Sequence, residues 1–95
     1  MKKGTPVVVT TDSTKRGVFG GLFVSEKSDV VVLSEARMAV YWDKETRGVV
    51  GLASTGPTVG CRISPPAKTI KLNGVTSVME MTPEALAAWR KQPWG

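Results

Sequence analysis

The amino-acid sequence predicts a single, mainly β domain over residues 1–95: a small barrel of five or six short strands with a short inserted helix and a C-terminal helix. Three observations lead to this prediction. Short runs rich in valine and isoleucine, separated by turn residues, follow one another up to residue 81, as in all-β domains. Two adjacent glycines, Gly20 and Gly21, interrupt the longest run. The motif Thr-Pro-Glu at 82–84 then starts a helical pattern.

Four runs in the first half of the chain are expected as strands, because each is rich in valine or aromatic residues. They lie at residues 5–11, 17–25, 30–33 and 37–42, with turns or bends at 12–16, 26–29 and 34–36. Glycine weakens a strand interior, since it packs nothing and loses the most backbone entropy on folding. Gly20 and Gly21 therefore predict a corner, where the strand turns from pairing with 5–11 to pairing with 30–33. A ligand that approaches the backbone at these glycines is the alternative.

The middle of the chain predicts less regular structure. A short helix is expected around residues 46–54, with Gly56 as its C-terminal stop before a proline. Gly48 and Gly51 weaken this pattern and leave an irregular loop as the alternative. The segment PTVGCRISPP, which is bounded by prolines, is expected to form a short edge strand.

A hairpin is expected near the end of the β-rich part. Residues 68–72 and 75–81 alternate apolar and polar side chains on either side of Asn73-Gly74. This dipeptide accepts a positive φ at both positions, as a type I′ turn requires, so the two runs are predicted to pair with each other.

The last element is expected as a helix over residues 82–92. Thr82 is a suitable N-cap, Pro83 fits the first helical position, and Pro93 follows the end of the pattern. Trp89 and Trp94 are expected to anchor this helix, in the same chain or in a neighbouring subunit.

The charge of the chain is unevenly distributed. The net charge is +5, and no Asp or Glu lies between Thr46 and Met79. That stretch carries four basic residues: Arg47, Arg62, Lys68 and Lys71. A positive field of this kind attracts phosphate groups of nucleic acids or small nucleotides, and a merely solvated basic face is the alternative.

Cysteine and histidine content restricts the chemistry of the chain. Cys61 is the only cysteine and there is no histidine. One cysteine excludes a disulfide within the chain and suits a reducing cytosol, so a cytoplasmic location is expected, without a signal peptide or a membrane-spanning stretch. The common catalytic, cofactor and metal-binding motifs are absent from the sequence, so we expect neither an enzyme nor a bound cofactor or metal.

The first half of the chain resembles the first motif of the Sm-like family. The residues that carry the resemblance are Gly17, Gly20, Leu22, Asp29, Val30–Leu33 and Glu35-Ala36, and IKLNGVTSVMEM is similar to the second motif. The resemblance implies a small bent barrel of the SH3/Sm type that closes into rings and binds RNA. Val31 and Val32 replace the RNA-stacking asparagine, Asn73-Gly74 replaces an Arg-Gly pair, and the helix is C-terminal rather than N-terminal. The resemblance therefore implies the barrel fold more strongly than it implies RNA binding.

The chain also resembles a family of short uncharacterised proteins of tailed phages and prophages. The matching residues are Val7, Val9, Gly17, Val18, Gly21, Leu22, Val30, Val32, Leu33, Ala36, Arg37, Trp42, Leu52, Ala53, Gly56, Pro83, Glu84 and Ala85. This resemblance implies a phage origin, and hence the cytoplasm of a bacterial host, but no reaction.

A basic and aromatic constellation is the expected binding site. Alternation along residues 37–42 places Arg37, Ala39 and Tyr41 on one face, expected to be exposed, and Met38, Val40 and Trp42 on the other, expected in the core. An arginine fork beside an aromatic ring is typical of nucleotide binding. The expected ligand-binding residues are Arg37, Tyr41, Arg47, Arg62, Thr55 and Gly56, the last two from a loop whose N–H groups would meet an anion. The alternative is a surface ion pair of Arg37 with Glu35 or Asp43.

These features predict a non-enzymatic phage-type protein that sequesters a small nucleotide signal of bacterial antiphage immunity, either a cyclic nucleotide or an NAD-derived one. A pocket shared between subunits would enclose such a ligand, so a homo-oligomer, a dimer or larger, is expected. An Sm-like RNA-binding oligomer is the first alternative. A protein–protein inhibitor or a structural phage protein is the second.

Overall fold

The computed structural model describes residues 1–12 and 17–94. Residues 13–16 of the predicted 12–16 turn lie outside the described part. Six strands, two α-helices and one 3₁₀ turn follow in the order β1 (Pro6–Thr11), β2 (Val18–Lys27), β3 (Val30–Tyr41), η1 (Lys44–Thr46), α1 (Gly48–Ser54), β4 (Arg62–Ile63), β5 (Ala67–Leu72), β6 (Val75–Glu80) and α2 (Pro83–Lys91). The mainly β fold class with two helices is confirmed. No helix in the described ranges has the length and apolarity needed to span a bilayer.

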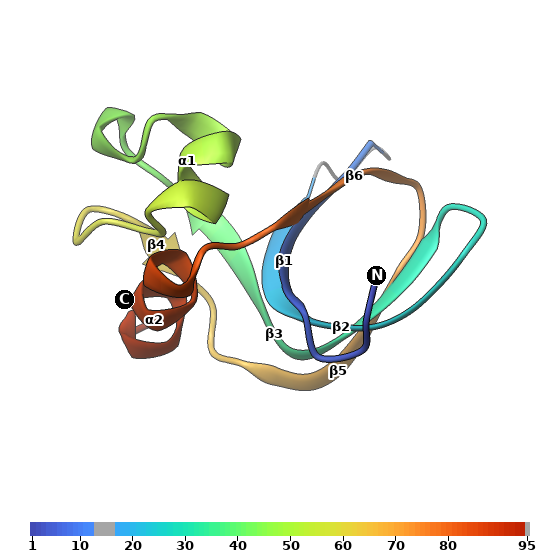
Figure 1. Ribbon diagram of the computed structural model, residues 1–95. Coiled ribbons are helices and arrows are strands. Elements are labelled where there is room, and N and C mark those ends of the chain that lie inside the picture. Colours follow the sequence, from blue (N-terminus) through green and yellow to red (C-terminus); the bar gives the residue numbers. More distant parts are fainter. Residues whose placement is uncertain (13–16, 95) are drawn as a thin grey trace.

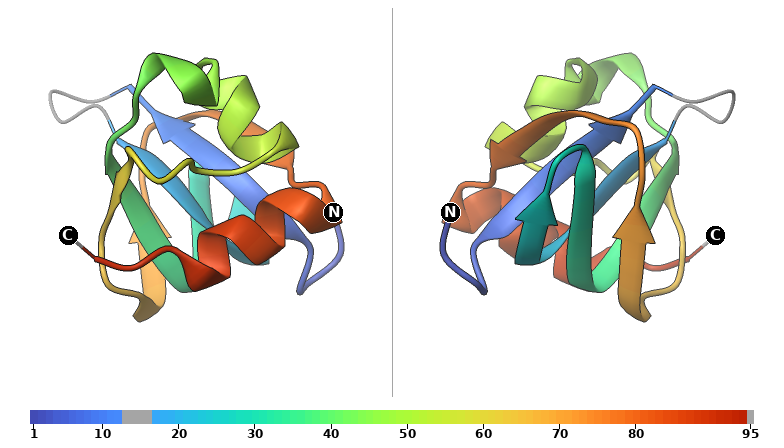
Figure 2. Two further views of the ribbon diagram at one scale, coloured as in Figure 1. Left: turned by 90° about the vertical axis from the view of Figure 1, so that its left-hand side faces the viewer. Right: turned by 90° about the vertical axis from the view of Figure 1, so that its right-hand side faces the viewer.

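The strands form one antiparallel sheet that curls around itself (Figure 1). The strand order is β4-β3-β2-β1-β6, and β5 also pairs with β3. The long strand β3 is therefore shared: its first half pairs with β5 and its last residues pair with β4. Both helices pack on the same side of this sheet (Figure 2).

Two clusters of buried side chains make up the core. One lies within the curled sheet and includes Val7, Val9, Val31 and Leu33. The other lies between the sheet and the two helices and includes Val8, Leu52, Ile63 and Trp89. The alternation of β1 sends Val7 and Val9 to the first cluster and Val8 to the second. This strand is buried on both faces, which explains its uninterrupted run of valines.

The predicted irregularity at Gly20 and Gly21 is present. The ladder between β2 and β3 shifts register between Gly20 and Leu22, where two residues of β3 lie opposite Gly21 alone. A Cβ at Gly20 would lie 2.8 Å from the indole ring of Trp89, and one at Gly21 would lie 2.9 Å from a backbone oxygen of β3. Both glycines are therefore required by close packing at a β-bulge. The group that approaches the backbone at Gly20 is a side chain of the same protein.

The bend predicted at 34–36 is the other half of this bulge. Glu35 adopts a left-handed backbone conformation, with a φ of 49°. Residues 30–33 and 37–42 were expected as separate strands, but β3 continues through the bulge to Tyr41. A bulge bends a strand without ending it, because pairing resumes in a new register on the far side.

The predicted hairpin of 68–72 with 75–81 is wrong. β5 pairs with β3 and β6 pairs with β1, and no ladder joins β5 to β6 among the residues that the structure describes. Gly74 has a φ of 67°, but Asn73 has no positive φ, so a type I′ turn does not form. Each strand buries its apolar side chains against a different edge of the sheet, and the Asn73-Gly74 link crosses between these edges.

One terminus of each α-helix lies where the sequence signals predict it: the beginning of α2 and the end of α1. The side chain of Thr82 accepts a hydrogen bond from the N–H of Ala85, at 3.0 Å, and caps α2. At the end of α1, the N–H of Gly56 donates to the carbonyl oxygen of Gly51, at 3.0 Å, with a φ of 85° at Gly56. Gly56 is thus the expected C-terminal stop. The predicted edge strand is also present, as β4.

Candidate functional site

The predicted exposure of the two faces of residues 37–42 is largely wrong. Arg37 and Ala39 are buried, with 9% and 4% of their surface exposed, whereas Val40 is 49% exposed. The helices cover the face that carries Arg37 and Ala39, so this face joins the core. On the other face, only Trp42 packs against this core cluster, and it is partly buried. Tyr41 follows the prediction and is 53% exposed at the end of β3.

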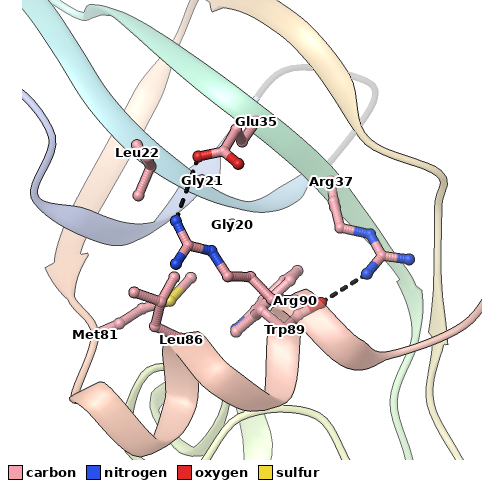
Figure 3. Close-up of a pocket in the computed structure, with 9 residues that line it drawn as sticks. All are labelled: Gly20, Gly21, Leu22, Glu35, Arg37, Met81, Leu86, Trp89 and Arg90. Atoms are coloured by element: carbon pink, nitrogen blue, oxygen red, sulfur yellow. Dashed lines mark hydrogen bonds and ion pairs between the residues drawn. The ribbon is translucent and has the colours of Figure 1, made fainter.

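Arg37 connects three segments of the chain. Its Nε donates to the carbonyl oxygen of Ser64 at 2.7 Å, and its Nη1 donates to the carbonyl oxygen of Trp89 at 2.6 Å (Figure 3). Burial lowers the pKa of Arg37 below its ordinary value, although a guanidinium stays protonated in proteins. These short, charge-assisted bonds tie β3 to the β4–β5 link and to the last turn of α2. The alternative, a surface ion pair of Arg37 with Glu35 or Asp43, is not among the contacts of the described residues.

A small cavity lies beside Arg37, over the two glycines of β2. It is lined by Gly20, Gly21, Leu22, Glu35, Arg37, Met81, Leu86, Trp89 and Arg90 (Figure 3). Its volume is about 30 Å³, which is enough for ordered water but far below the roughly 300–1,000 Å³ of small-molecule sites. A nucleotide therefore does not fit in this cavity.

A larger hollow lies at the C-terminal end of α2, and we call it the Arg–Trp hollow. Its volume is about 380 Å³, within the range of small-molecule sites. It is lined by Glu35, Arg37, Pro65, Pro66, Arg90, Gln92, Pro93 and Trp94. Four parts of the chain contribute to it: β3 at and after its bulge, the proline-containing link between β4 and β5, the last turn of α2, and the segment that follows α2. Two arginines and one glutamate give its lining a positive balance.

The segment after α2 is held in place by polar contacts. Nε2 of Gln92 donates to the carbonyl oxygens of Thr58 and Cys61, at 3.1 Å each. The guanidinium of Arg62 lies over the ring of Trp94, 5.6 Å from its centroid, in a cation–π contact. Trp94 remains 52% exposed. The aromatic side chain at the hollow is therefore held by its neighbours while much of its surface stays open to solvent.

The structure brings together some of the predicted binding residues and separates others. Arg37 lines the Arg–Trp hollow, and Arg62 contacts it through Trp94. Tyr41 is the ladder partner of Arg62 and lies next to that contact. Arg47, Thr55 and Gly56 do not line the hollow.

Arg47, Thr55 and Gly56 lie at the two ends of α1. Arg47 is exposed, has a φ of 64° and occupies the N-cap position. The N–H groups of Thr55 and Gly56 both donate to the carbonyl oxygen of Gly51. These two N–H groups satisfy the helix end, and so the predicted anion loop does not present them to a ligand.

Sequence reasoning missed the other residues of the hollow. Arg90 and Glu35 were not among the predicted binding residues, and Glu35 was expected at a bend or as an ion-pair partner of Arg37. Pro65 and Pro66 had been expected to bound an edge strand. The sequence shows Pro65-Pro66 and Pro93-Trp94 as two short stiff segments. No local pattern indicates that the bulge of β3 lies beside either of them.

Cys61 does not itself line the hollow, and its thiol lies in a polar cluster with Thr46 and Thr58. It is buried, and its Sγ lies 3.0 Å from Oγ1 of Thr46, which also contacts Asp43. Burial raises the pKa of the thiol, but hydrogen bonds from Thr46 and Thr58 and from nearby backbone groups outweigh it. The pKa of Cys61 lies below its ordinary value of 9.0. Within the described residues, no group of three or more Cys, Asp or Glu could hold a metal ion.

Comparison with family models finds one match. The model described as "Domain of unknown function (DUF6948)" matches residues 4–89. The chain belongs to the DUF6948 family. The matched residues include the whole sheet and both glycines of the bulge, and the match stops at Trp89 within α2, before the segment that carries Trp94. Comparisons with curated proteins and with solved structures find no match. The phage origin and the Sm-like motif stay predictions.

Proposed function

We propose that this DUF6948 chain is a non-enzymatic binding protein for a small nucleotide, which it holds in the Arg–Trp hollow. The observation that carries the proposal is the meeting of Arg37, Arg90 and Trp94 around one hollow of about 380 Å³. Sequestering a nucleotide signal of antiphage immunity is the role that we propose for this binding.

The aromatic part of the ligand is assigned to Trp94. A nucleobase stacks on an aromatic side chain with a gain of about 1–3 kcal/mol per base. Arg62 lies over the Trp94 ring and restrains it, which reduces the entropy that the ring loses when a base stacks on it. Because Trp94 is half-exposed, it is accessible to a base without a rearrangement of the core.

The phosphate part of the ligand is assigned to the arginines. Arg90 is exposed and extends from the last turn of α2 towards Glu35 (Figure 3). Arg37 uses Nε and Nη1 in structural bonds, which leaves Nη2 without a partner among the described residues. Guanidinium groups bind phosphate oxygens through paired N–H donors. Two such groups at one hollow suit a ligand with one or two phosphates.

Native mass spectrometry tests this proposal. The protein is mixed with cyclic dinucleotides, cyclic trinucleotides, cyclic ADP-ribose isomers, nucleoside monophosphates and a short oligoribonucleotide. We expect a stoichiometric small-nucleotide adduct on a homo-oligomer, lost in Trp94→Ala and in Arg90→Ala. Lys91→Ala is the matched control, because Lys91 is an exposed neighbour that does not line the hollow. An adduct that persists in both hollow variants would contradict the assignment of the site.

RNA binding is a second candidate, favoured by a different hollow. Lys27 of β2 and Lys71 of β5 flank an apolar floor of Val30 and Val32 in a hollow of about 370 Å³. Its lining contains no aromatic residue for base stacking. An adduct with the oligoribonucleotide alone, weakened by Lys71→Ala and by added salt, would support this candidate instead.

A further inference from the structure

Glu35 is the one acidic side chain among the described residues that line the Arg–Trp hollow. A carboxylate beside two arginines is unfavourable for a ligand that carries only phosphate, because it repels the anion. It is favourable for a ligand that presents phosphate to the arginines and hydrogen-bond donors to the carboxylate. The lining of the hollow therefore suits a ligand with both kinds of group.

The backbone of Glu35 supports a role for its side chain. Its φ of 49° is unfavourable for a residue with a Cβ, and glycine or asparagine adopts this conformation more readily. The residue lies at the β-bulge that faces Gly21, and bulges often re-aim a side chain beside a site. Here the bulge places the carboxylate at the edge of the hollow rather than within the sheet.

The contacts of Glu35 leave its carboxylate open to a ligand. Oε2 accepts from Nη2 of Arg90 at 3.4 Å, and the two side chains are 59% and 57% exposed. A long ion pair between exposed groups is weak. Oε1 has no hydrogen-bond partner among the described residues. The pair therefore positions the carboxylate loosely and leaves acceptor sites free.

We infer that the nucleotide bound in this hollow carries guanine and that Glu35 is the residue that selects it, an inference that rests on the proposed function. Guanine presents two neighbouring donors, N1–H and the 2-amino group, on one edge of its ring. The two oxygens of a carboxylate accept both at once. Adenine has an acceptor at N1, which the carboxylate repels. Hypoxanthine keeps the N1–H donor but lacks the amino group.

Isothermal titration calorimetry with GMP, IMP and AMP tests the inference, and cyclic di-GMP and cyclic di-AMP repeat the comparison in ligands with two bases. A bidentate contact to a base edge discriminates by about tenfold or more. We expect GMP to bind at least tenfold more tightly than AMP, with IMP between them. In Glu35→Gln the affinity for GMP should fall about tenfold while that for AMP changes little. Glu26→Gln, an exposed glutamate away from the hollow, should change neither.

The outcomes separate the inference from the proposed function. If guanine and adenine nucleotides bind equally and Glu35→Gln has no effect, the guanine assignment is overturned and nucleotide binding stands. If an adenine nucleotide binds more tightly, the assignment is overturned in the same way. If none of the five nucleotides binds and the mass spectra contain no adduct that depends on Trp94, both are overturned. Circular dichroism of Glu35→Gln should match that of the unsubstituted protein, so that a loss of binding reports on the carboxylate.

Discussion

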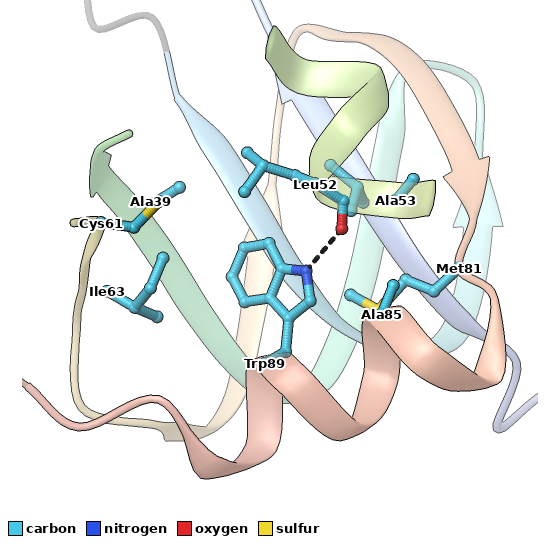
Figure 4. Close-up of a cluster of buried hydrophobic side chains, with 9 residues drawn as sticks. Ala39, Leu52, Ala53, Cys61, Ile63, Met81, Ala85 and Trp89 are labelled. Atoms are coloured by element: carbon cyan, nitrogen blue, oxygen red, sulfur yellow. Dashed lines mark hydrogen bonds between the residues drawn. The ribbon is translucent and has the colours of Figure 1, made fainter. Parts of the chain in front are cut away.

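Gly20→Ala tests the close packing between β2 and α2. A Cβ at this position would lie 2.8 Å from three atoms of the Trp89 indole, a separation that requires one of the two groups to move. Trp89 cannot move easily, because it is 3% exposed, and its Nε1 donates to the carbonyl oxygen of Leu52 at 2.9 Å (Figure 4). The added methyl group must therefore displace either the β-bulge or the ring that joins α2 to α1.

The magnitude follows from three contributions. Overpacking a filled core destabilises a protein by about 1–3 kcal/mol. A shift of the indole that breaks its bond to Leu52 adds about 1 kcal/mol. Alanine reduces the freedom of the unfolded chain and returns about 0.5 kcal/mol. The expected net decrease in the free energy of unfolding is about 1.5–3.5 kcal/mol.

Urea unfolding followed by tryptophan fluorescence and by circular dichroism measures this decrease. A double-mutant cycle with Trp89→Leu identifies its cause, because a smaller side chain leaves room for the methyl group. In the Trp89→Leu background, Gly20→Ala should cost less than about 0.5 kcal/mol. A similar cost of Gly20→Ala in both backgrounds, or a cost near zero in the unsubstituted protein, would refute the assigned contact.

Three further perturbations follow from the structure. Arg37→Met removes charge-assisted bonds to two carbonyl oxygens and should lower the free energy of unfolding by about 2–3 kcal/mol in urea titrations; a change below about 0.5 kcal/mol would contradict the assigned role. Thr82→Ala removes the N-cap of α2 and should cost about 1 kcal/mol by thermal unfolding, whereas Thr82→Ser should restore most of it. The pKa of Cys61 is lower in the folded protein than its ordinary value of 9.0, so folding favours the thiolate. Its contribution to stability should be complete above pH 9.0 and disappear as the pH falls through the lowered pKa. In Cys61→Ala, the free energy of unfolding should therefore rise less with pH in this range. If the free energy of unfolding has the same pH dependence in both proteins, Cys61 makes no such contribution.

The candidate site could be predicted from the sequence only in part. The sequence indicated the residue types of the candidate site, because an arginine and an aromatic ring are recognisable wherever they stand. Arg37 lines the hollow, but its predicted exposure was wrong, since α2 covers that face of β3. Glu35, Arg90 and Trp94 line one hollow only because the tertiary structure brings the bulge of β3 and the end of α2 together.

The sequence by itself determined several local conformations of this DUF6948 domain. Thr82 and Gly56 specified helix ends, and Gly20-Gly21 specified an irregular strand, because capping, positive φ and the loss of a Cβ act within a few residues. The tertiary structure alone decided which strands pair and which faces are buried. Asn73-Gly74 has the composition of a hairpin turn, yet β5 pairs with β3 and β6 pairs with β1. Which strands pair depends on the burial of side chains from the whole chain, and a two-residue turn motif contains no information about that burial.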